Sequence, residues 1–286
     1  TVLMTVVPAK VAGVKEIVIC TPPRNNNETI LVAADLLGVT EIYNVGGSQA
    51  VAAMAYGTDS IPKVDKIVGP GNIYVTAAKK VVYGDVGVDF IAGPSEIMIV
   101  AEKGNAEFIA ADMLSQAEHD RLSSAILVTT NEKLAKQVEK ELDKQLAELK
   151  TKDIAQESLR KYGAIIIAKN IDNAFDVVND FAPEHLEIMS DDEKLLSKVK
   201  NAGAVFLGEY SVEAAGDYCS GPNHVLPTKG FAKARAGLSV MDFVKMPTLQ
   251  KLTKQGLKSM GDTIIRLASV EGLDAHKKSI EKRIKQ

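Results

Sequence analysis

Four histidines are the residues of this chain best suited to catalysis or metal binding, and each has a carboxylate or an amide nearby. They are His119, His185, His224 and His276. A histidine can be a general base, a proton shuttle or a metal ligand, but a lone one is often a surface or core residue. The polar residues beside each histidine therefore decide its candidate role.

The segment Gln116-Ala117-Glu118-His119-Asp120 lies at the end of a helix expected near 106–115. Gln116 and His119 are three residues apart, so they share one helix face. An amide oxygen and an imidazole on one face can both bind a metal ion. The same spacing also suits a polar helix end with a histidine near the negative end of the helix dipole. The pair alone leaves both interpretations open.

The segment Phe181-Ala182-Pro183-Glu184-His185 precedes a strand expected over 186–189. Neighbouring residues of an extended chain face opposite ways, but at an irregular strand start both side chains can reach one cleft. Glu184 and His185 could then act as a general base and a proton shuttle. A solvated turn is the alternative.

Residues 214–224 form an expected loop that is dense in small residues and contains Asp217, Cys219 and His224. Loops that combine Gly and Pro with a carboxylate and a histidine serve function more often than packing. Asp217 is a candidate oxygen ligand for a metal, and His224 could support such a ligand from behind. Since no activating histidine is evident beside Cys219, we expect a small buried cysteine and not a nucleophile.

Three further segments carry weaker signals. Glu271 and His276 stand at the start of the last expected helix and could reach into a cleft, although the local sequence indicates only a helix start. Glycine-rich turns occur at 69–72 and 92–96. The first precedes a helix, so its backbone N–H groups could face an anion. No G-x-G-x-x-G follows a strand, so the pattern itself gives no direct evidence for NAD.

Alternating strands and helices must position these side chains. Apolar runs predict strands near 16–20, 41–45, 66–68, 97–100, 125–128, 164–168, 186–189 and 204–207, and periodic patterns predict helices near 28–37, 49–56, 73–83, 106–115 and 132–149, with a helical tail from about 247. This order predicts an α/β fold in which helices cover parallel sheets.

Composition excludes several classes of protein. The 286 residues suggest about two domains, and 46% hydrophobic with 25% charged residues is ordinary for globular proteins. A net charge of -3 and no Trp argue against nucleic-acid binding. No apolar run reaches about 18 residues, so no membrane span is expected. Two cysteines, Cys20 and Cys219, allow no disulfide framework and favour a reduced, cytoplasmic compartment.

Six segments together resemble the motifs of the histidinol dehydrogenase family. They are Val-Gly-Pro-Gly-Asn-Ile-Tyr-Val at 68–75, Ala-Gly-Pro-Ser-Glu-Ile at 92–97, Asp-Met-Leu-Ser-Gln-Ala-Glu-His-Asp at 112–120, Phe-Ala-Pro-Glu-His-Leu-Glu at 181–187, Gly-Asp-Tyr-Cys-Ser-Gly-Pro-Asn-His-Val-Leu-Pro-Thr at 216–228 and Glu-Gly-Leu-Asp-Ala-His at 271–276. Their order and spacing run over the whole chain. The resemblance covers about the last two-thirds of a typical member. Because the chain starts at Thr1 in an apolar stretch, we expect that an N-terminal part is missing.

The resemblance implies an enzyme that oxidises L-histidinol to L-histidine through the aldehyde, with two NAD and one zinc ion, in the last step of histidine biosynthesis. By matching motif positions, it implies zinc ligands Gln116, His119, Asp217 and His276, acid–base residues Glu184 and His185, further substrate contacts Ser95 and Glu271 beside His185 and the zinc ligands, and NAD contacts Gln49 and Asn72.

The resemblance also implies an architecture. It consists of two Rossmann-like parallel-sheet domains, a cofactor-side domain over 1–94 and a zinc- and substrate-binding domain over 95–245, with a small helical segment over 246–286. Family members are homodimers in which this last segment reaches the partner's site, so Glu271 and His276 would act in trans. Two other functions stay open from the residues alone. One is a zinc-dependent hydrolase in which Glu184 activates a water, and the other is an inactive truncated protein that binds zinc or imidazole.

Overall fold

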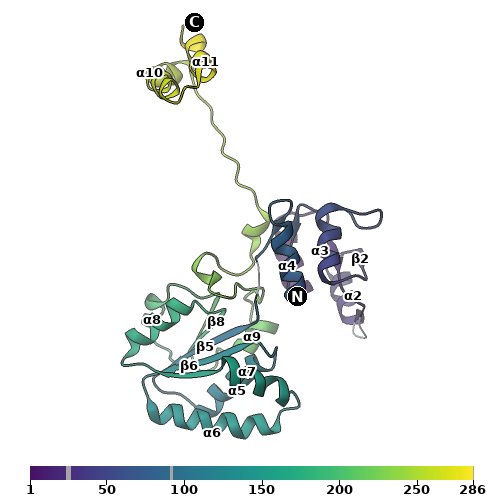
Figure 1. The fold of residues 1–286 in the computed structure, drawn as a ribbon, viewed down its shortest axis with the longest axis vertical. Coiled ribbons are helices and arrows are strands. Elements are labelled where there is room, and N and C mark those ends of the chain that lie inside the picture. The colour runs from purple at the N-terminus through teal and green to yellow at the C-terminus, as the bar shows by residue number, and fades with distance from the viewer. Residues whose placement is uncertain (24–26, 91–92, 286) are drawn as a thin grey trace. The chain divides into compact units, whose positions relative to one another are not determined.

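The computed structural model describes residues 1–23, 27–90 and 93–285 and divides into two compact units, Thr1–Val244 and Lys245–Gln286. Strands alternate with helices along the first unit, and all described strand pairs are parallel (Figure 1). The α/β fold expected from the sequence is therefore confirmed. Within the described ranges, no helix has the length and apolar character needed to cross a membrane.

The largest sheet among the described residues has five strands in the order β7-β6-β5-β8-β9 and lies in the first unit. Its strands are β5 (Glu96–Ala101), β6 (Ser124–Thr129), β7 (Ala164–Ile167), β8 (His185–Ile188) and β9 (Ala204–Leu207). Every residue of β5 and β8 is buried. Strands covered on both faces favour continuous apolar runs, such as Ile97–Val100 in β5, whereas β8 includes the buried polar residues His185 and Glu187.

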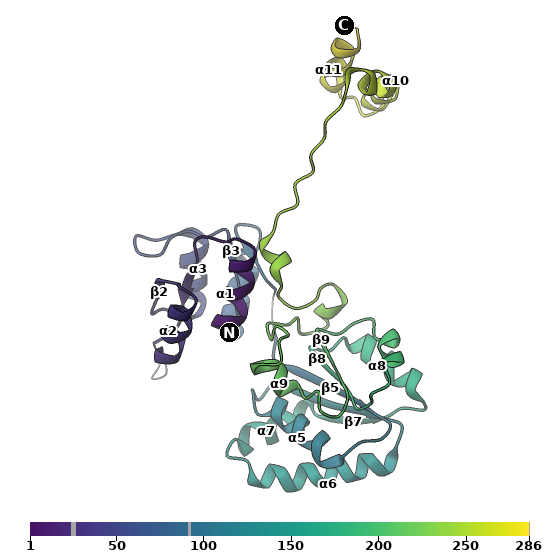
Figure 2. The same cartoon turned by 180° about the vertical axis from the view of Figure 1, so that it is seen from behind.

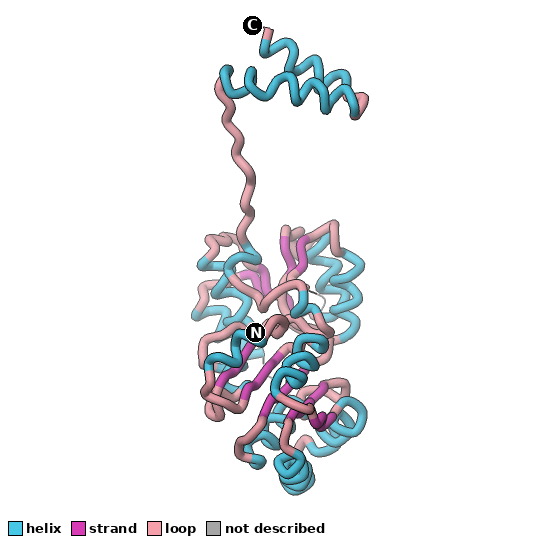
Figure 3. The backbone as a smooth tube through the Cα atoms, turned by 90° about the vertical axis from the view of Figure 1, so that its left-hand side faces the viewer, coloured by secondary structure: helices cyan, strands magenta, loops and turns pink. Residues whose placement is uncertain are grey.

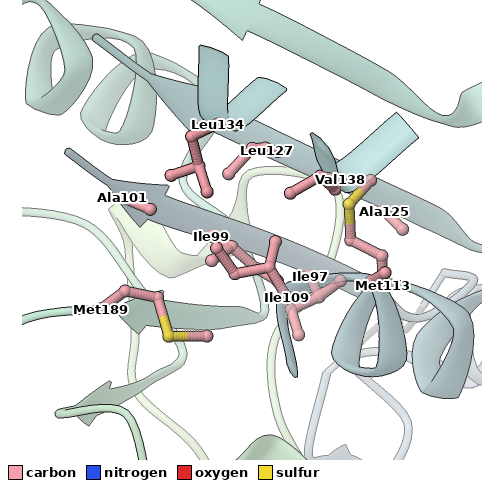
Figure 4. Close-up of a cluster of buried hydrophobic side chains, with 11 residues drawn as sticks. Ile97, Ile99, Ala101, Ile109, Met113, Ala125, Leu127, Leu134, Val138 and Met189 are labelled. Carbon is pink, nitrogen blue, oxygen red and sulfur yellow. The ribbon is translucent and has the colours of Figure 1, made fainter. Parts of the chain in front are cut away.

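Helices cover both faces of this sheet, and alternate residues of each strand face opposite layers. Ile97, Ile99 and Leu127 pack toward α5 (Ala106–Ala117) and α6 (Glu132–Glu148), with α7 (Lys152–Tyr162) beside them (Figure 4). The side chains between them, such as Met98 and Val100, pack toward α8 (Ile171–Phe181). Since α5 returns antiparallel to β5, its carboxyl end lies at the edge of the sheet where the strands begin.

Asparagine side chains fix the starts of these helices. The side chain of Asn105 accepts a hydrogen bond from the backbone of Glu107 in α5, and Asn131 and Asn170 cap α6 and α8 in the same way. Such caps satisfy N–H groups that have no partner within the helix. The first turns of the covering helices are therefore set locally.

The N-terminal part of the first unit contains two shorter parallel pairs, β1 with β2 and β3 with β4 (Figure 2). Its elements are α1 (Val2–Val11), β1 (Val18–Cys20), α2 (Asn27–Leu36), β2 (Glu41–Tyr43), α3 (Gly47–Tyr56), β3 (Lys66–Ile67), α4 (Ile73–Val82) and β4 (Gly87–Val88). Val51 of α3 and Val82 of α4 share a buried cluster with Ile67 and Val88 of the second pair. This packing positions the loop between β3 and α4.

The second unit is a pair of helices, α10 (Lys254–Val270) and α11 (Asp274–Ile284), which lie side by side (Figure 3). Gly272, with φ +72°, makes the turn between them. A Cβ on Gly261 of α10 would meet the Ile284 side chain at 3.1 Å, so the small residue lets the helices approach closely.

Several elements differ from the sequence-based expectation. The stretch over 214–224, expected as a loop, starts with a short helix, α9 (Glu213–Tyr218). Helices α1, α7 and α8 were not predicted, and the helical part of the tail begins at Lys254 instead of about 247. Short helical turns also occur at Glu193–Lys198, Phe231–Lys233 and Val240–Phe243.

Candidate active site

A group of buried polar side chains lies at the edge of the five-stranded sheet where the strands begin. Glu96 starts β5, His185 starts β8, and α5 ends at Ala117 on the same edge. Helix α9 follows β9 along the chain (Figure 2). It contributes Glu213 and Asp217. Many α/β proteins bind ligands at the opposite, carboxyl edge. Here the polar group is at the amino edge because α5 and the irregular strand starts deliver its residues there.

His185 is held as a neutral base. The residue is 4% exposed, and its Nδ1 lies 3.0 Å from the backbone oxygen of Glu96. Because a carbonyl oxygen only accepts, Nδ1 carries the proton and Nε2 keeps its lone pair. Burial lowers the pKa of His185 to about 4, so the imidazole is uncharged at neutral pH. A neutral ring with an open lone pair can accept a proton from a substrate.

Glu184 lies beside this base, as the sequence predicted for an irregular strand start. Its Oε2 accepts a hydrogen bond of 2.9 Å from the backbone N–H of Glu96 and lies 3.9 Å from Nδ1 of His185. Burial, aided by the nearby carboxylates, raises the pKa of Glu184 well above its usual range. Its carboxylate is therefore a stronger base than that of an exposed glutamate.

Glu213 is a site residue that sequence reasoning missed. It is 1% exposed, its Oε1 lies 3.9 Å from Nε2 of His185, and this oxygen has no hydrogen-bond partner among the described residues. Burial, with the charge of Asp217, raises the pKa of Glu213 to about 7. Glu213 reaches the site only because the chain reverses direction after β9. Local sequence spacing does not indicate such a tertiary contact, so no pattern predicted it.

Two more acids extend the group inward beneath Glu213. The backbone N–H of Glu213 donates to Oε1 of Glu187 at 2.7 Å, and Glu187 shares a hydrogen bond with Asp112 of α5. Burial first, and then the charge of Asp112, raise the pKa of Glu187 to about 9, so this acid keeps its proton at neutral pH. Burial also raises the pKa of Asp112 to about 6. The sequence signal for Glu187 was an acidic residue between the apolar residues of a predicted buried strand.

His119 and Asp217 meet in the structure, as a shared metal site requires. Nε2 of His119 lies 3.5 Å from Oδ2 of Asp217, and Nδ1 lies 2.9 Å from the backbone oxygen of Ser115. The interaction with Asp217 raises the pKa of His119 to about 9. His224 contacts the backbone oxygen of Asp217 through Nδ1 at 2.9 Å, which is the supporting place proposed for it.

The pKa of Asp217 shows what this corner of the site favours. Burial is the largest single influence and acts to raise it, but the hydrogen bond from His119 and the histidines nearby together lower the pKa below its usual value. This part of the site thus stabilises the ionised carboxylate of Asp217 next to a positively charged group. A cation can use the same preference.

Gln116 provides a test of whether the expected donors fit a metal ion. Its side chain is fully buried, yet neither Oε1 nor Nε2 has a hydrogen-bond partner in the described part of the chain. A buried amide without partners is costly, which indicates that something else binds it. Nitrogen and oxygen donors from Gln116, His119 and Asp217 suit zinc.

A second donor group overlaps with this one. One ligand atom each of His185, Glu213 and Asp217 lies within 4.8 Å of the others. The two groups share Asp217. The unpaired amide of Gln116 favours the set that contains Gln116, because it gives that amide a partner.

The remaining predicted residues belong to other elements of the chain. Ser95, half-buried, immediately precedes β5. Gln49 in the first turn of α3 and Asn72 before α4 are exposed in the N-terminal part. Glu271 and His276 belong to the second unit and are exposed. Within that unit, His276 lines a hollow of about 370 Å³ between α10 and α11.

Two other observations concern the surroundings of the site. Cys219 is exposed, so the expectation of a buried cysteine was wrong; it follows the end of α9, where the chain turns toward solvent. A hollow of about 530 Å³ lies beside β9 and α9, and none of the predicted site residues lines it. Phe206 borders both the hollow and the ring of His185, at 6.1 Å between ring centroids.

Fold and site together define a class: a parallel-sheet α/β enzyme with a buried glutamate–histidine pair beside nitrogen and oxygen donors that suit a metal. The family model of histidinol dehydrogenase matches residues 1–284. Histidinol dehydrogenase of Methanothermobacter thermautotrophicus is 52% identical over 100% of this chain and 68% of its own length, and that of Bacillus cereus is 55% identical over 100% and 67%.

A solved structure agrees with these relatives. The crystal structure of histidinol dehydrogenase from Elizabethkingia anophelis matches with a TM-score of 0.95 and 45% identity, covering 100% of this chain and 67% of that one. The chain belongs to the histidinol dehydrogenase family, and it is accordingly an oxidoreductase of histidine biosynthesis. It spans about two-thirds of the length of these relatives.

Proposed function

We propose that this chain oxidises L-histidinol to L-histidine through the aldehyde, with two NAD and a zinc ion. Histidinol, two NAD⁺ and one water give histidine, two NADH and three protons. The observation that carries the proposal is the neutral, buried His185 beside Glu184, one residue with an open lone pair and the other with a raised pKa. Both oxidation steps need a group that accepts the proton of the hydroxyl on the reacting carbon. The second step also needs an activated water.

Zinc would be held by Gln116, His119, Asp217 and His276. Support comes from the buried amide of Gln116, which has no partner in the described residues, and from His119 and Asp217, which lie 3.5 Å apart. When bound, zinc would anchor the imidazole nitrogen and the amine of histidinol, both of which are good donors to it. Ser95, His185 and Glu271 would add contacts to the substrate.

His185 would accept the hydroxyl proton of histidinol at Nε2. Its Nδ1–H bond to the backbone of Glu96 fixes the ring and the tautomer while this happens. NAD, when bound, would supply the hydride acceptor that both oxidations require. Glu184 would activate the water that adds to the aldehyde, because its raised pKa makes the carboxylate a good proton acceptor.

The NAD contacts would be Gln49 and Asn72. Each stands in or before the first turn of a helix that follows a parallel strand, which is the usual place for nucleotides in α/β folds. The Oδ1 of Asn72 already accepts hydrogen bonds from Tyr74 and Val75. A contact with the cofactor would therefore use its amide nitrogen.

The working protein would be a cytoplasmic homodimer. Glu271 and His276 from the second unit would complete the site of the partner, and the division into parts at residues 94 and 245 belongs to the same proposal. The substrate is a small molecule, and the net charge of -3 offers no footprint for nucleic acid.

Incubating the zinc-loaded chain with limiting histidinol and excess NAD tests the proposal. We expect two NADH per histidinol by absorbance, with histidine as the product. A yield of one NADH would mean that the reaction stops at the aldehyde. Cleavage of amide or ester substrates without any NADH would instead identify a zinc hydrolase and reject the proposal.

A further inference from the structure

A buried ion pair in the N-terminal part has no role in the chemistry described so far. Lys79 of α4 and Asp89, which directly follows β4, lie 2.6 Å apart between Nζ and Oδ1. Their side chains are only 4% and 0% exposed. Replacing a buried ion pair by apolar residues is often neutral or stabilising, so such a pair is weak evidence for a role in stability. The contacts of the pair show what else it does.

Both charges bind the same backbone residue, Gly69. The N–H of Gly69 donates to Oδ2 of Asp89 at 2.8 Å, and Nζ of Lys79 donates to the carbonyl oxygen of Gly69. Asp89 also accepts at Oδ1 from the N–H of Phe90 at 2.7 Å. The two polar groups of Gly69 are thus fixed by opposite halves of one ion pair.

Gly69 needs this fixation because its backbone is unusual. Its φ of +118° lies in a region that L-residues rarely adopt. Glycine can adopt this φ, but its wide conformational freedom does not hold the backbone there. Three residues later, Asn72 caps α4, the helix that carries Lys79. The ion pair therefore ties the turn over 69–72 to the helix on one side and to the end of β4 on the other.

The acid of this pair is itself anchored from a distant part of the chain. Arg235 donates to the backbone oxygen of Asp89, lies over the ring of Phe90 at 4.9 Å, and pairs with Asp242 at 2.5 Å. The end of β4 is thus held in place when it binds Gly69. A rigid anchor is what a positioning role requires.

We propose that Lys79 and Asp89 are positioning residues that hold the turn over 69–72 in the conformation that binds NAD. The proposal rests on the proposed function, in which Asn72 contacts the cofactor. The pair acts through the backbone of Gly69 and does not touch the reacting atoms. Loss of either charge should therefore weaken NAD binding and leave the zinc and histidinol sites intact.

Three variants of the full 286-residue chain test this: Lys79→Met, Asp89→Asn and, as a matched control, Lys80→Met. Lys80 is the next residue of the same helix and is exposed. We expect Lys79→Met and Asp89→Asn to raise the Kd for NAD about tenfold or more and to raise KM for NAD much more than they lower kcat. Zinc content and the Kd for histidinol should stay unchanged, and Lys80→Met should behave as wild type.

A further variant, Gly69→Ala, keeps the ion pair and alters only the backbone preference. A Cβ at this position would meet no other atom within 4 Å, so the change introduces strain at φ +118° without a clash. We expect weaker NAD binding with an unchanged circular dichroism spectrum. This variant decides the question if the charge variants do not fold.

The outcomes separate the two proposals. A folded Lys79→Met or Asp89→Asn that binds NAD as wild type does overturns the positioning role alone, as does a folded Gly69→Ala with unchanged affinity. Equal losses of histidinol and NAD binding would also reject it, because they indicate general damage. If the wild-type chain does not bind NAD at all, the proposed cofactor use is wrong and the positioning role falls with it.

Discussion

At the scale of single residues, burial sets the chemistry of the site. His185 and Glu184 are adjacent in the sequence, yet burial lowers the pKa of the histidine to about 4 and raises that of the glutamate well above its usual range. Both shifts disfavour the charged form of the group. The result is a neutral histidine base next to a glutamate whose carboxylate binds a proton more tightly than an exposed carboxylate does.

Replacing His185 by Asn tests the role of its Nε2 lone pair. The Asn amide can still donate to the backbone oxygen of Glu96, but it offers no base. We expect kcat for histidinol to fall by about 10²–10⁴-fold, the range typical of general acid–base catalysis. Zinc content, measured by atomic emission, should not change. Loss of zinc would show that His185 binds the metal instead.

Replacing Glu184 by Gln tests the hydration step. The Gln oxygen can keep the hydrogen bond from the Glu96 N–H, which is 2.9 Å long in the wild type, but it cannot take a proton from water. We expect oxidation of added histidinaldehyde to slow more than oxidation of histidinol in single-turnover assays. Equal damage to both steps would contradict a specific role in hydration.

Glu187→Gln should make stability less dependent on pH. Folding raises the pKa of Glu187 from 4.5 to about 9, so the folded wild type keeps a proton that the unfolded chain releases. The contribution of Glu187 to stability is therefore full below about pH 4.5 and is lost as pH rises toward 9, by at most about 1.4 kcal/mol per pH unit. Because Gln cannot ionise, the free energy of unfolding of the variant should increase relative to that of the wild type as pH rises from 5 to 8. Urea denaturation of the metal-free proteins would measure this difference. A constant difference across this range would mean that Glu187 does not stay protonated in the fold.

At the scale of elements, the sequence predicted most of the framework. Strand β9, at the edge of the sheet and only partly buried, agrees residue for residue with its apolar run. The bounds of β5 and β6 are each within two residues of their apolar runs, because strands buried on both faces leave a continuous signal. Helix α8 was missed although Ile171, Ala174 and Val178 follow a helical period. Helix α7 gave little signal, since it buries only Ala155 and Ser158.

The site was predictable only where its residues are close in sequence. The adjacency of Glu184 and His185 follows from the local sequence. The helix face expected to carry Gln116 and His119 stays a prediction, because α5 ends at Ala117 and His119 lies beyond it. The contact of Glu213 with His185 depends on a chain reversal after β9, and no local rule encodes that pairing. The expectation of a buried Cys219 was wrong for a related reason, because local composition does not show that the chain turns toward solvent after α9.

Asn72→Asp separates a structural from a cofactor role at the start of α4. Aspartate can still cap the N–H groups of Tyr74 and Val75, whereas Asn72→Ala should cost about 1 kcal/mol of stability through the lost cap. Asp lacks the amide nitrogen and adds a negative charge. We expect thermal stability near wild type for Asn72→Asp but a clearly raised KM for NAD. Wild-type NAD kinetics would remove Asn72 from the proposed contacts.

At the scale of the whole molecule, the proposed zinc ligands are divided between two units. Gln116, His119 and Asp217 belong to the first, and His276 belongs to a helix pair that packs on its own. No helix or strand lies between Phe243 and Lys254, and residues 244–253 are exposed. A ligand carried on such a segment can be supplied by a second copy of the chain.

Mixing two inactive variants tests donation in trans. His119→Ala and His276→Ala subunits, unfolded and refolded together in equal amounts, would form mixed dimers in which one of the two sites is intact. Statistical pairing then predicts recovery of about a quarter of wild-type activity. If His276 acted within its own chain, every site would lack a ligand and no activity would return. Each variant refolded alone serves as the control.

The hydrogen bond that orients Glu184 comes from a main-chain amide at the first residue of β5. Every amino acid except proline supplies that group, so substitutions at position 96 can alter the surroundings of the carboxylate without removing its donor. The orientation of the Glu184 carboxylate therefore depends on the backbone of the sheet and not on the side chain at position 96. Redesign of the nearby side chains, for instance to admit a different alcohol, could proceed while that orientation is kept.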